Sequence, residues 1–185
     1  MSTTNRRRGA ALYYATRDGQ SRRIAEHIFN RLAASETLGP PQDVTVARPG
    51  DLAAASLIVL VAAVRYGKHL PEADRFLAAY RSLESPPPLA LASVNLTARK
   101  PAKTTATGNA YLRKTIARHR LAPALAVAFA GRLDYRRYGW LDRQIIRFIM
   151  LLTRGPTDPD TCIEYTSWPA VDEFAARIAD LQRRA

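Results

Sequence analysis

Short apolar runs alternate with longer amphipathic stretches along almost the whole chain. The runs read as strands, and each is followed by a stretch whose apolar residues recur every three or four positions, as in a helix. The expected strands span residues 10–15, 43–47, 56–63, 89–94 and 124–131, with a last short strand at 161–166. The expected helices span residues 20–35, 71–83, 109–120, 139–155 and 168–183. Such alternation predicts an α/β fold with a doubly wound, parallel sheet of five main strands, because right-handed crossovers place helices on both faces.

The length and the charge of the chain limit its partners. The 185 residues are enough for one domain with a sizeable core. The net charge of +12 predicts an anionic partner, which is nucleic acid, an acidic membrane surface or an acidic small molecule. Nucleic acid is not expected, because the tyrosines are not interleaved with basic residues and no recognition-helix motif is present.

Cysteine and histidine are too sparse for the usual metal and disulfide sites. The single cysteine, Cys162, excludes an internal disulfide and a paired-cysteine metal site, and a reduced cytosolic thiol is its expected state. His27, His69 and His119 have no metal-ligand spacing, so no metal is expected. No window reaches the roughly 18 apolar residues of a membrane span, and the apolar stretch near the start is too short for a signal peptide. We therefore expect a cytoplasmic protein.

The turn after the first expected strand is the first candidate site. It reads Thr16-Arg17-Asp18-Gly19-Gln20-Ser21. Ligands of parallel sheets bind at the carboxyl ends of the strands, where this turn lies. Gly19 lets the backbone approach a ligand, two hydroxyl groups are at hand, and the next helix offers its free N–H groups, which together suit a phosphate. The turn is neither a Walker loop nor a dinucleotide fingerprint. From the residues alone, a plain helix cap is an equally good interpretation.

Four segments together resemble one protein family. They are ATRDGQS, VRYGKH, SVNLTARKPAK and AGRLDYRRYGWLDRQIIRFIM. The first is similar to the loop of flavodoxin-like proteins that holds the phosphate of FMN. All four resemble the flavodoxin-like, menaquinone-dependent protoporphyrinogen oxidases of bacteria, over residues 12–178. The third and fourth segments are the most specific, because ordinary flavodoxins have neither.

The resemblance implies a fold and a reaction. The fold is flavodoxin-like, the cofactor is FMN, and the reaction is the oxidation of protoporphyrinogen IX to protoporphyrin IX in haem biosynthesis. The electron acceptor is a quinone, either menaquinone or ubiquinone. An FMN-dependent NAD(P)H:quinone reductase and a flavodoxin-type electron carrier are the alternatives. Such carriers tend to be acidic, in contrast to the charge of +12.

The resemblance also implies three groups of flavin-binding residues. The turn Thr16, Arg17, Asp18, Gly19, Gln20 and Ser21 would hold the phosphate. The loop Ala63, Val64, Arg65, Tyr66 and Gly67 would line the isoalloxazine ring, either with Tyr66 stacked on it or with that side chain half-buried against the sheet. The loop Val94, Asn95, Leu96, Thr97 and Ala98 would lie on the other side of the ring. No catalytic residue is identified, because Glu26, His27 and His69 have no support as a general base.

One long segment of the chain carries charge of a single sign. Between Ser85 and Leu133 there are basic residues but no Asp or Glu, whereas solvated faces normally mix both signs. The substrate implied by the resemblance carries propionates. Arg99, Lys100 and Lys103 are therefore the candidates for binding those carboxylates.

The expected helix from residue 139 is amphipathic and lies outside the strand–helix alternation. Leu141, Ile145, Phe148 and Leu152 fall on one face, and Arg143, Arg147 and Arg154 fall on another. The pattern alone fits a membrane interface, a core helix or a contact in a homo-oligomer. The resemblance favours peripheral association with the inner membrane, because a quinone dissolves in lipid. We expect this helix in an insert at about 132–160 of a single domain, 10–185, after a basic extension, 1–9.

Overall fold

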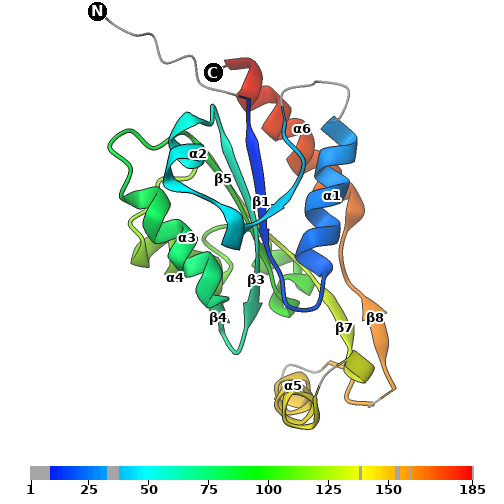
Figure 1. The fold of residues 1–185 in the computed structure, drawn as a ribbon. Helices are drawn as coiled ribbons and strands as arrows, with labels where there is room; N and C mark the ends of the chain where they lie inside the picture. Colours follow the sequence, from blue (N-terminus) through cyan, green and yellow to red (C-terminus); the bar gives the residue numbers. More distant parts are fainter. Residues whose placement is uncertain (1–8, 33–37, 138, 153–154, 159, 185) are drawn as a thin grey trace, which may run out of the picture.

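The centre of the molecule is a parallel sheet with helices on both faces (Figure 1). This computed structural model describes residues 9–32, 38–137, 139–152, 155–158 and 160–184. The strands lie in the spatial order β2 (Gln42–Asp43), β1 (Ala11–Ala15), β3 (Ile58–Arg65), β5 (Leu89–Val94) and β6 (Leu125–Phe129). All four pairings are parallel, which confirms the predicted doubly wound, five-stranded sheet. The strand order reverses beside β1 and β3, and ligands bind at such a switch point.

Each face of the sheet has its own layer of helices (Figure 1). One layer consists of α1 (Gln20–Leu32) and α6 (Trp168–Arg184). The other consists of α2 (Pro49–Ala54), α3 (Pro71–Arg81) and α4 (Ala110–Arg118), of which the sequence pattern did not predict the short α2. On β3, Leu60 belongs to the core under α3, whereas Val59 and Val61 belong to the core under α1. Strands covered on both faces are apolar at successive positions for this reason.

The predicted strand at 43–47 is mostly wrong. The strand ends at Asp43, and Val44–Val46 form a 3-10 turn. The Asp43 carboxylate accepts hydrogen bonds from the Thr45 backbone N–H at 2.9 Å and from the Thr45 hydroxyl at 2.7 Å. Local bonds of this kind compete with the hydrogen bonds of a sheet, so the chain turns although its residues favour a strand.

The expected loop after β3 is the tip of a hairpin. β3 extends to Arg65 and pairs antiparallel with β4 (Lys68–His69). Tyr66 and Gly67 connect the two strands with φ angles of 50° and 77°. Two successive residues with positive φ make the tight hairpin turn whose twist matches that of the strands. The sequence conceals this turn, because tyrosine is uncommon in a left-handed conformation.

An antiparallel ribbon carries the amphipathic helix away from the sheet. β7 (Arg132–Asp134) pairs with β8 (Cys162–Glu164), and α5 (Trp140–Leu152) lies at the far end of this arm (Figure 1). The last expected strand therefore forms, but in a second sheet. Buried Leu133, Tyr135 and Met150 pack together where α5 meets the ribbon. Of the extension 1–9, only Gly9 is among the described residues.

Candidate functional site

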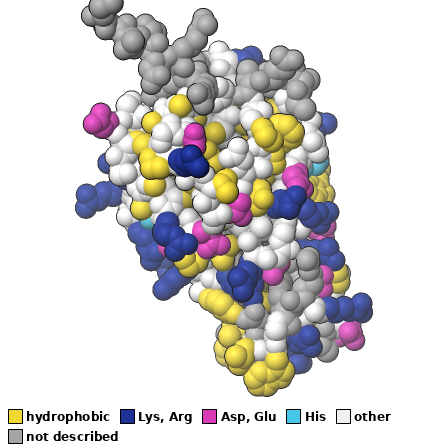
Figure 2. Space-filling model, viewed as in Figure 1, with side chains coloured by type: hydrophobic (Ala, Val, Ile, Leu, Met, Phe, Trp, Pro, Cys, Tyr) yellow, Lys and Arg dark blue, Asp and Glu magenta, His cyan; other side chains and the backbone are white. Residues whose placement is uncertain are grey.

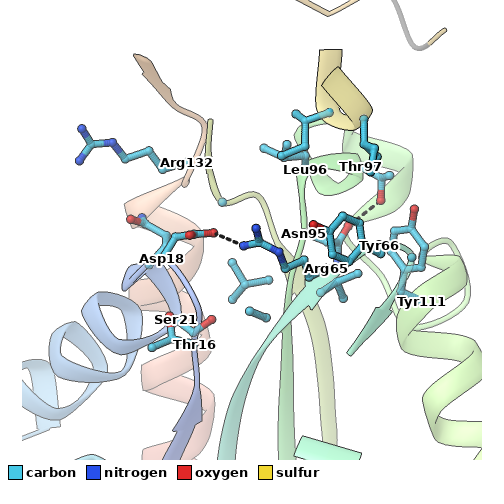
Figure 3. Close-up of a pocket in the computed structure, with 18 residues that line it drawn as sticks. Thr16, Asp18, Ser21, Arg65, Tyr66, Asn95, Leu96, Thr97, Tyr111 and Arg132 are labelled. Atoms are coloured by element: carbon cyan, nitrogen blue, oxygen red, sulfur yellow. Dashed lines mark hydrogen bonds and ion pairs between the residues drawn. The ribbon is translucent and has the colours of Figure 1, made fainter. Parts of the chain in front are cut away.

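A pocket lies at the carboxyl ends of β1, β3 and β5, where the strand order reverses (Figure 3). It unites all three loops that the sequence singled out, and it adds residues from α4, β7 and α5. The residues that line it are Thr16, Asp18, Gln20, Ser21, Ala63, Val64, Arg65, Tyr66, Gly67, Val94, Asn95, Leu96, Thr97, Tyr111, Gly131, Arg132, Ile145 and Ile146.

The turn after β1 has the chemistry of an anion site. The Thr16 hydroxyl accepts a hydrogen bond from the Gly19 N–H at 3.0 Å, and Gly19 adopts a φ of 87°. α1 begins at the next residue, so its first N–H groups, which lack intrahelical partners, belong to this turn. The buried Ser21 hydroxyl has no hydrogen-bond partner among the described residues. A buried hydroxyl left over at a helix N-terminus fits a ligand phosphate.

Gln20 and Arg17, in the same turn, have different surroundings from Thr16 and Ser21. The Gln20 amide donates hydrogen bonds to the Glu164 carboxylate at 3.0 Å and to the Thr166 hydroxyl at 2.9 Å, so it ties the turn to β8. Arg17 is exposed and does not line the pocket.

The hairpin tip forms the second wall of the pocket. The Arg65 guanidinium lies 3.4 Å from the Asp18 carboxylate, which connects the tip to the turn after β1 (Figure 3). The same guanidinium lies 5.3 Å from the centre of the Tyr66 ring. Tyr66 is 56% exposed beside the pocket. An exposed aromatic face at a pocket is available for stacking.

The loop after β5 forms the third wall, but its basic continuation points elsewhere. Asn95 is buried and accepts a hydrogen bond from the Thr97 hydroxyl at 2.6 Å (Figure 3). Arg99 lies at the end of the 3-10 turn η3 (Leu96–Arg99) and lines a second cavity, beside α6. Lys100 and Lys103, at η4 (Pro101–Lys103), are exposed and line neither cavity. The structure therefore does not bring the three basic candidates into the pocket.

Five residues of the pocket were not predicted. Tyr111 comes from α4, Gly131 and Arg132 come from the start of the arm, and Ile145 and Ile146 come from α5. Arg132 pairs with Asp134 at 3.1 Å. Arg132 could have been predicted, because it directly follows the strand expected at 124–131. Ile145 and Ile146 could not, because their location depends on how the arm folds back toward the sheet.

The three residues considered as a general base lie outside the pocket. Glu26 pairs with Arg22 at 2.8 Å, and His27 bonds to Asp172 on α6 at 2.8 Å. His69 is buried, and burial lowers its pKa to about 4. Among the described residues there is no group of three His, Cys, Asp or Glu side chains that could hold a metal ion. In the same part of the chain, no helix has the length and hydropathy needed to cross a membrane.

Known proteins are similar to this chain in sequence. A family described as a flavodoxin domain matches residues 11–160. A protoporphyrinogen IX dehydrogenase (quinone) of Leishmania major is 39% identical over 92% of this chain and 74% of its own length. The protein of the same name from Escherichia coli K12 is 35% identical over 92% of this chain and 94% of its own length.

Solved structures agree on the architecture. Oxidised flavodoxin 1 from Bacillus cereus has a TM-score of 0.54 and 14% identity, and covers 96% of this chain and 99% of its own. An archaeal flavodoxin has a TM-score of 0.51 and 13% identity, over 95% of this chain and 99% of its own. These structures are too distant to show more than the fold. The chain belongs to the flavodoxin domain family and, within it, is a relative of the proteins named protoporphyrinogen IX dehydrogenase (quinone).

Proposed function

We propose that this protein uses FMN to oxidise protoporphyrinogen IX to protoporphyrin IX and passes the electrons to menaquinone or ubiquinone, as a step of haem biosynthesis. The observation that carries the proposal is the identity of 35–39% over 92% of the chain with proteins named for this reaction. The pocket at the switch point of the sheet supports the flavin part of it.

Different residues of the pocket would bind different parts of the flavin. The turn from Thr16 to Ser21 holds the phosphate, because it combines a spare buried hydroxyl with the N-terminus of α1. The hairpin tip at Tyr66 and the loop at Leu96, which both line the pocket, would hold the ring. When bound, FMN supplies the hydride acceptance and the electron transfer.

The protein itself contributes orientation and charge. Asp18 is the only acidic residue among the described residues that line the pocket, and Arg65 pairs with it. We therefore assign no general base. Arg65 and Arg132 place positive charge at the pocket, which suits the propionates of the substrate. Arg99, Lys100 and Lys103 follow the loop after β5 but lie outside the pocket.

We further propose that α5 rests on the cytoplasmic surface of the inner membrane. Among the α5 side chains that the structure describes, five large apolar ones are exposed: Trp140, Leu141, Ile145, Phe148 and Leu151. Figure 2 shows hydrophobic side chains gathered at this end of the molecule, with basic ones nearby. Such a helix binds at the boundary between headgroups and acyl chains. Ile145 is exposed and also lines the pocket, so a quinone dissolved in lipid meets the pocket beside the membrane. A homo-oligomer formed through this face is the competing use of α5.

An anaerobic fluorescence assay tests the reaction. The protein is mixed with FMN, a soluble quinone and protoporphyrinogen IX, and porphyrin emission is followed. We expect emission that requires both FMN and the quinone. Bound FMN without porphyrin emission, together with NADPH-dependent reduction of the quinone, would instead identify an NAD(P)H:quinone reductase.

A further inference from the structure

A chain of buried polar side chains connects two walls of the pocket. His69 lies on β4, the strand that follows the hairpin tip, and Asn95 directly follows β5. His69 Nε2 lies 2.9 Å from the Ser93 hydroxyl oxygen, and Asn95 Nδ2 donates to the same oxygen at 3.1 Å. The three residues are at most 5% exposed. Polar groups this deeply buried need their hydrogen bonds, because water does not replace a lost partner.

The direction of each hydrogen bond in this network of side chains follows from one backbone N–H group at its end. The Leu112 N–H, in the first turn of α4, donates to Asn109 Oδ1 at 3.1 Å. The other end of that amide therefore donates, and it reaches Asn95 Oδ1 at 3.0 Å. The same oxygen accepts from the Thr97 hydroxyl at 2.6 Å. With its oxygen used twice, Asn95 must turn its NH₂ group toward Ser93.

The hydrogen bonds of Ser93 favour one tautomer of His69. Ser93 accepts the hydrogen bond from Asn95, and among the described residues His69 Nε2 is the only acceptor within reach of its single proton. His69 then carries its own proton on Nδ1 and donates to the Thr115 hydroxyl, 2.7 Å away on α4. A protonated ring would leave the Ser93 hydroxyl without its acceptor. Burial favours the neutral ring, since it lowers the pKa of His69 to about 4.

One donor remains at the end of the network. The Asn95 amide has two N–H groups, one of which goes to Ser93, and no described residue accepts from the other. Asn95 lines the pocket. We propose that neutral His69 is a positioning residue that locks the hairpin tip to the loop after β5 and turns the Asn95 amide so that its second N–H serves an acceptor atom of the flavin ring. This inference rests on the proposed function for the identity of the ligand.

Substitutions at both ends of the network test the coupling. His69→Gln offers one amide where the ring bridges two hydroxyls, and it should raise the Kd of FMN roughly tenfold, the equivalent of about 1.4 kcal/mol. Asn95→Ala removes the donor itself and should weaken binding at least as much. The double variant should be no weaker than Asn95→Ala alone, because His69 acts through Asn95. His27→Gln is the matched control, since this histidine bonds to Asp172 between α1 and α6, and its Kd should not change.

The first readout is the quenching of FMN fluorescence on binding, and the second is nitrogen-15 NMR of the flavin-free protein. NMR should show His69 protonated on Nδ1. The Nε2-protonated tautomer, an unchanged Kd in His69→Gln, or effects of His69→Gln and Asn95→Ala that simply add would each overturn the inference. If His69→Gln does not fold, Ser93→Ala breaks the same connection and should raise the Kd equally. A wild-type protein that does not bind FMN would reject the proposed function, whereas binding unaffected by these variants would reject the positioning role alone.

Discussion

Gly19 and Tyr66 both have positive φ angles, 87° and 50°, and they belong to two loops that meet at the pocket. A left-handed backbone is unfavourable for a residue with a side chain, and such conformations gather at ligand sites. An added Cβ at Gly19 would meet no atom within 4 Å. The glycine is therefore required by the backbone conformation and not by protein packing, and the space around it is open to a ligand.

The first prediction concerns Gly19. Gly19→Val should raise the Kd of FMN at least tenfold, because the left-handed conformation costs about 1–2 kcal/mol with a side chain and the valine would also obstruct the phosphate. Gly50→Ala is the control, since Gly50 lies in α2 and also has open space around it. Retention of full FMN affinity in Gly19→Val, measured by fluorescence titration, would contradict the assignment of the phosphate loop.

Substitutions at Tyr66 can separate the contribution of its ring to FMN binding from that of its left-handed backbone. Asparagine tolerates the left-handed region, so Tyr66→Asn should keep the hairpin and the thermal stability while it removes the stacking surface. We expect a lower FMN affinity for Tyr66→Asn and an unchanged one for Tyr66→Phe. Equal affinities in the two variants would show that the ring does not stack on the flavin.

His69 should make stability depend on pH. Its pKa falls from 6.5 to about 4 in the folded protein because the charged ring is desolvated. The unfolded chain therefore binds a proton from about pH 6.5 downward, and the folded protein binds it only near pH 4. The free energy of unfolding should fall as the pH is lowered through this window, by up to about 3 kcal/mol, with no further contribution below it. Urea unfolding across the window should show this slope in wild type and in His27→Gln, and should show its loss in His69→Gln.

At the scale of single residues, the sequence predicted the location of a residue where that location follows from the order of strands and helices. The turn at Thr16–Ser21 and the residue Asn95 follow strands, so they had to lie at the carboxyl edge of the sheet. Arg99, Lys100 and Lys103 failed to reach the pocket because two 3-10 turns carry the chain away from it. The role of His69 was hidden, since a hydrogen-bond network between β4, β5 and α4 has no local pattern.

At the scale of elements, periodicity predicted the long segments and local chemistry decided the short ones. The buried strands β3 and β5 and the helices α1, α3 and α6 were predicted because burial dictates their apolar patterns. β4 has only two residues, and it exists because the Tyr66–Gly67 turn returns the chain along β3. The pairing of β7 with β8 was also missed, because residues 28 to 32 positions apart meet there.

The exposed face of α5 supplies the prediction for an element. Leu141→Ser combined with Phe148→Ser should abolish most binding to anionic lipid vesicles, because it removes apolar area from the surface that we propose enters the membrane. Both side chains are exposed, at 67% and 60%, so the stability of the fold should change little. Val46→Ser is the control, since Val46 is 59% exposed but belongs to the 3-10 turn after the edge strand β2 and not to α5. Vesicle sedimentation is the measurement, and unchanged sedimentation of the double variant would favour an oligomer contact, which analytical ultracentrifugation would detect.

At the scale of the whole molecule, the charge of +12 should act through long-range attraction. Salt shortens that attraction, with a Debye length of about 10 Å at 0.1 M and about 3 Å at 1 M. We expect the kcat/KM for the anionic porphyrinogen to fall as salt is added, whereas the KM for a neutral quinone should stay nearly constant. Steady-state assays over a range of salt concentrations test this.

A matched pair of triple variants separates local from global charge. Replacing Arg99, Lys100 and Lys103 by Gln should reduce the salt dependence of kcat/KM. Replacing Arg48, Arg75 and Arg81 by Gln changes the net charge equally, but these exposed residues lie elsewhere: Arg48 directly precedes α2, and Arg75 and Arg81 lie on α3. Equal effects of the two triple variants on kcat/KM would mean that only the overall charge matters. Arg99, Lys100 and Lys103 would then have no local role in substrate capture.

The direction of the parallel strands also separates the start of β1 and the end of α6 from the pocket. β1 starts at the edge of the sheet opposite the pocket, and α6 ends near that same edge, while α5 occupies the other extreme of the molecule (Figure 1). An affinity tag, a fluorescent reporter or a coupling to a solid support can therefore be joined before β1 or after α6, away from the pocket and from α5. The same enzyme is in this way suited to oriented attachment on an electrode, with its apolar helix turned toward an added lipid layer.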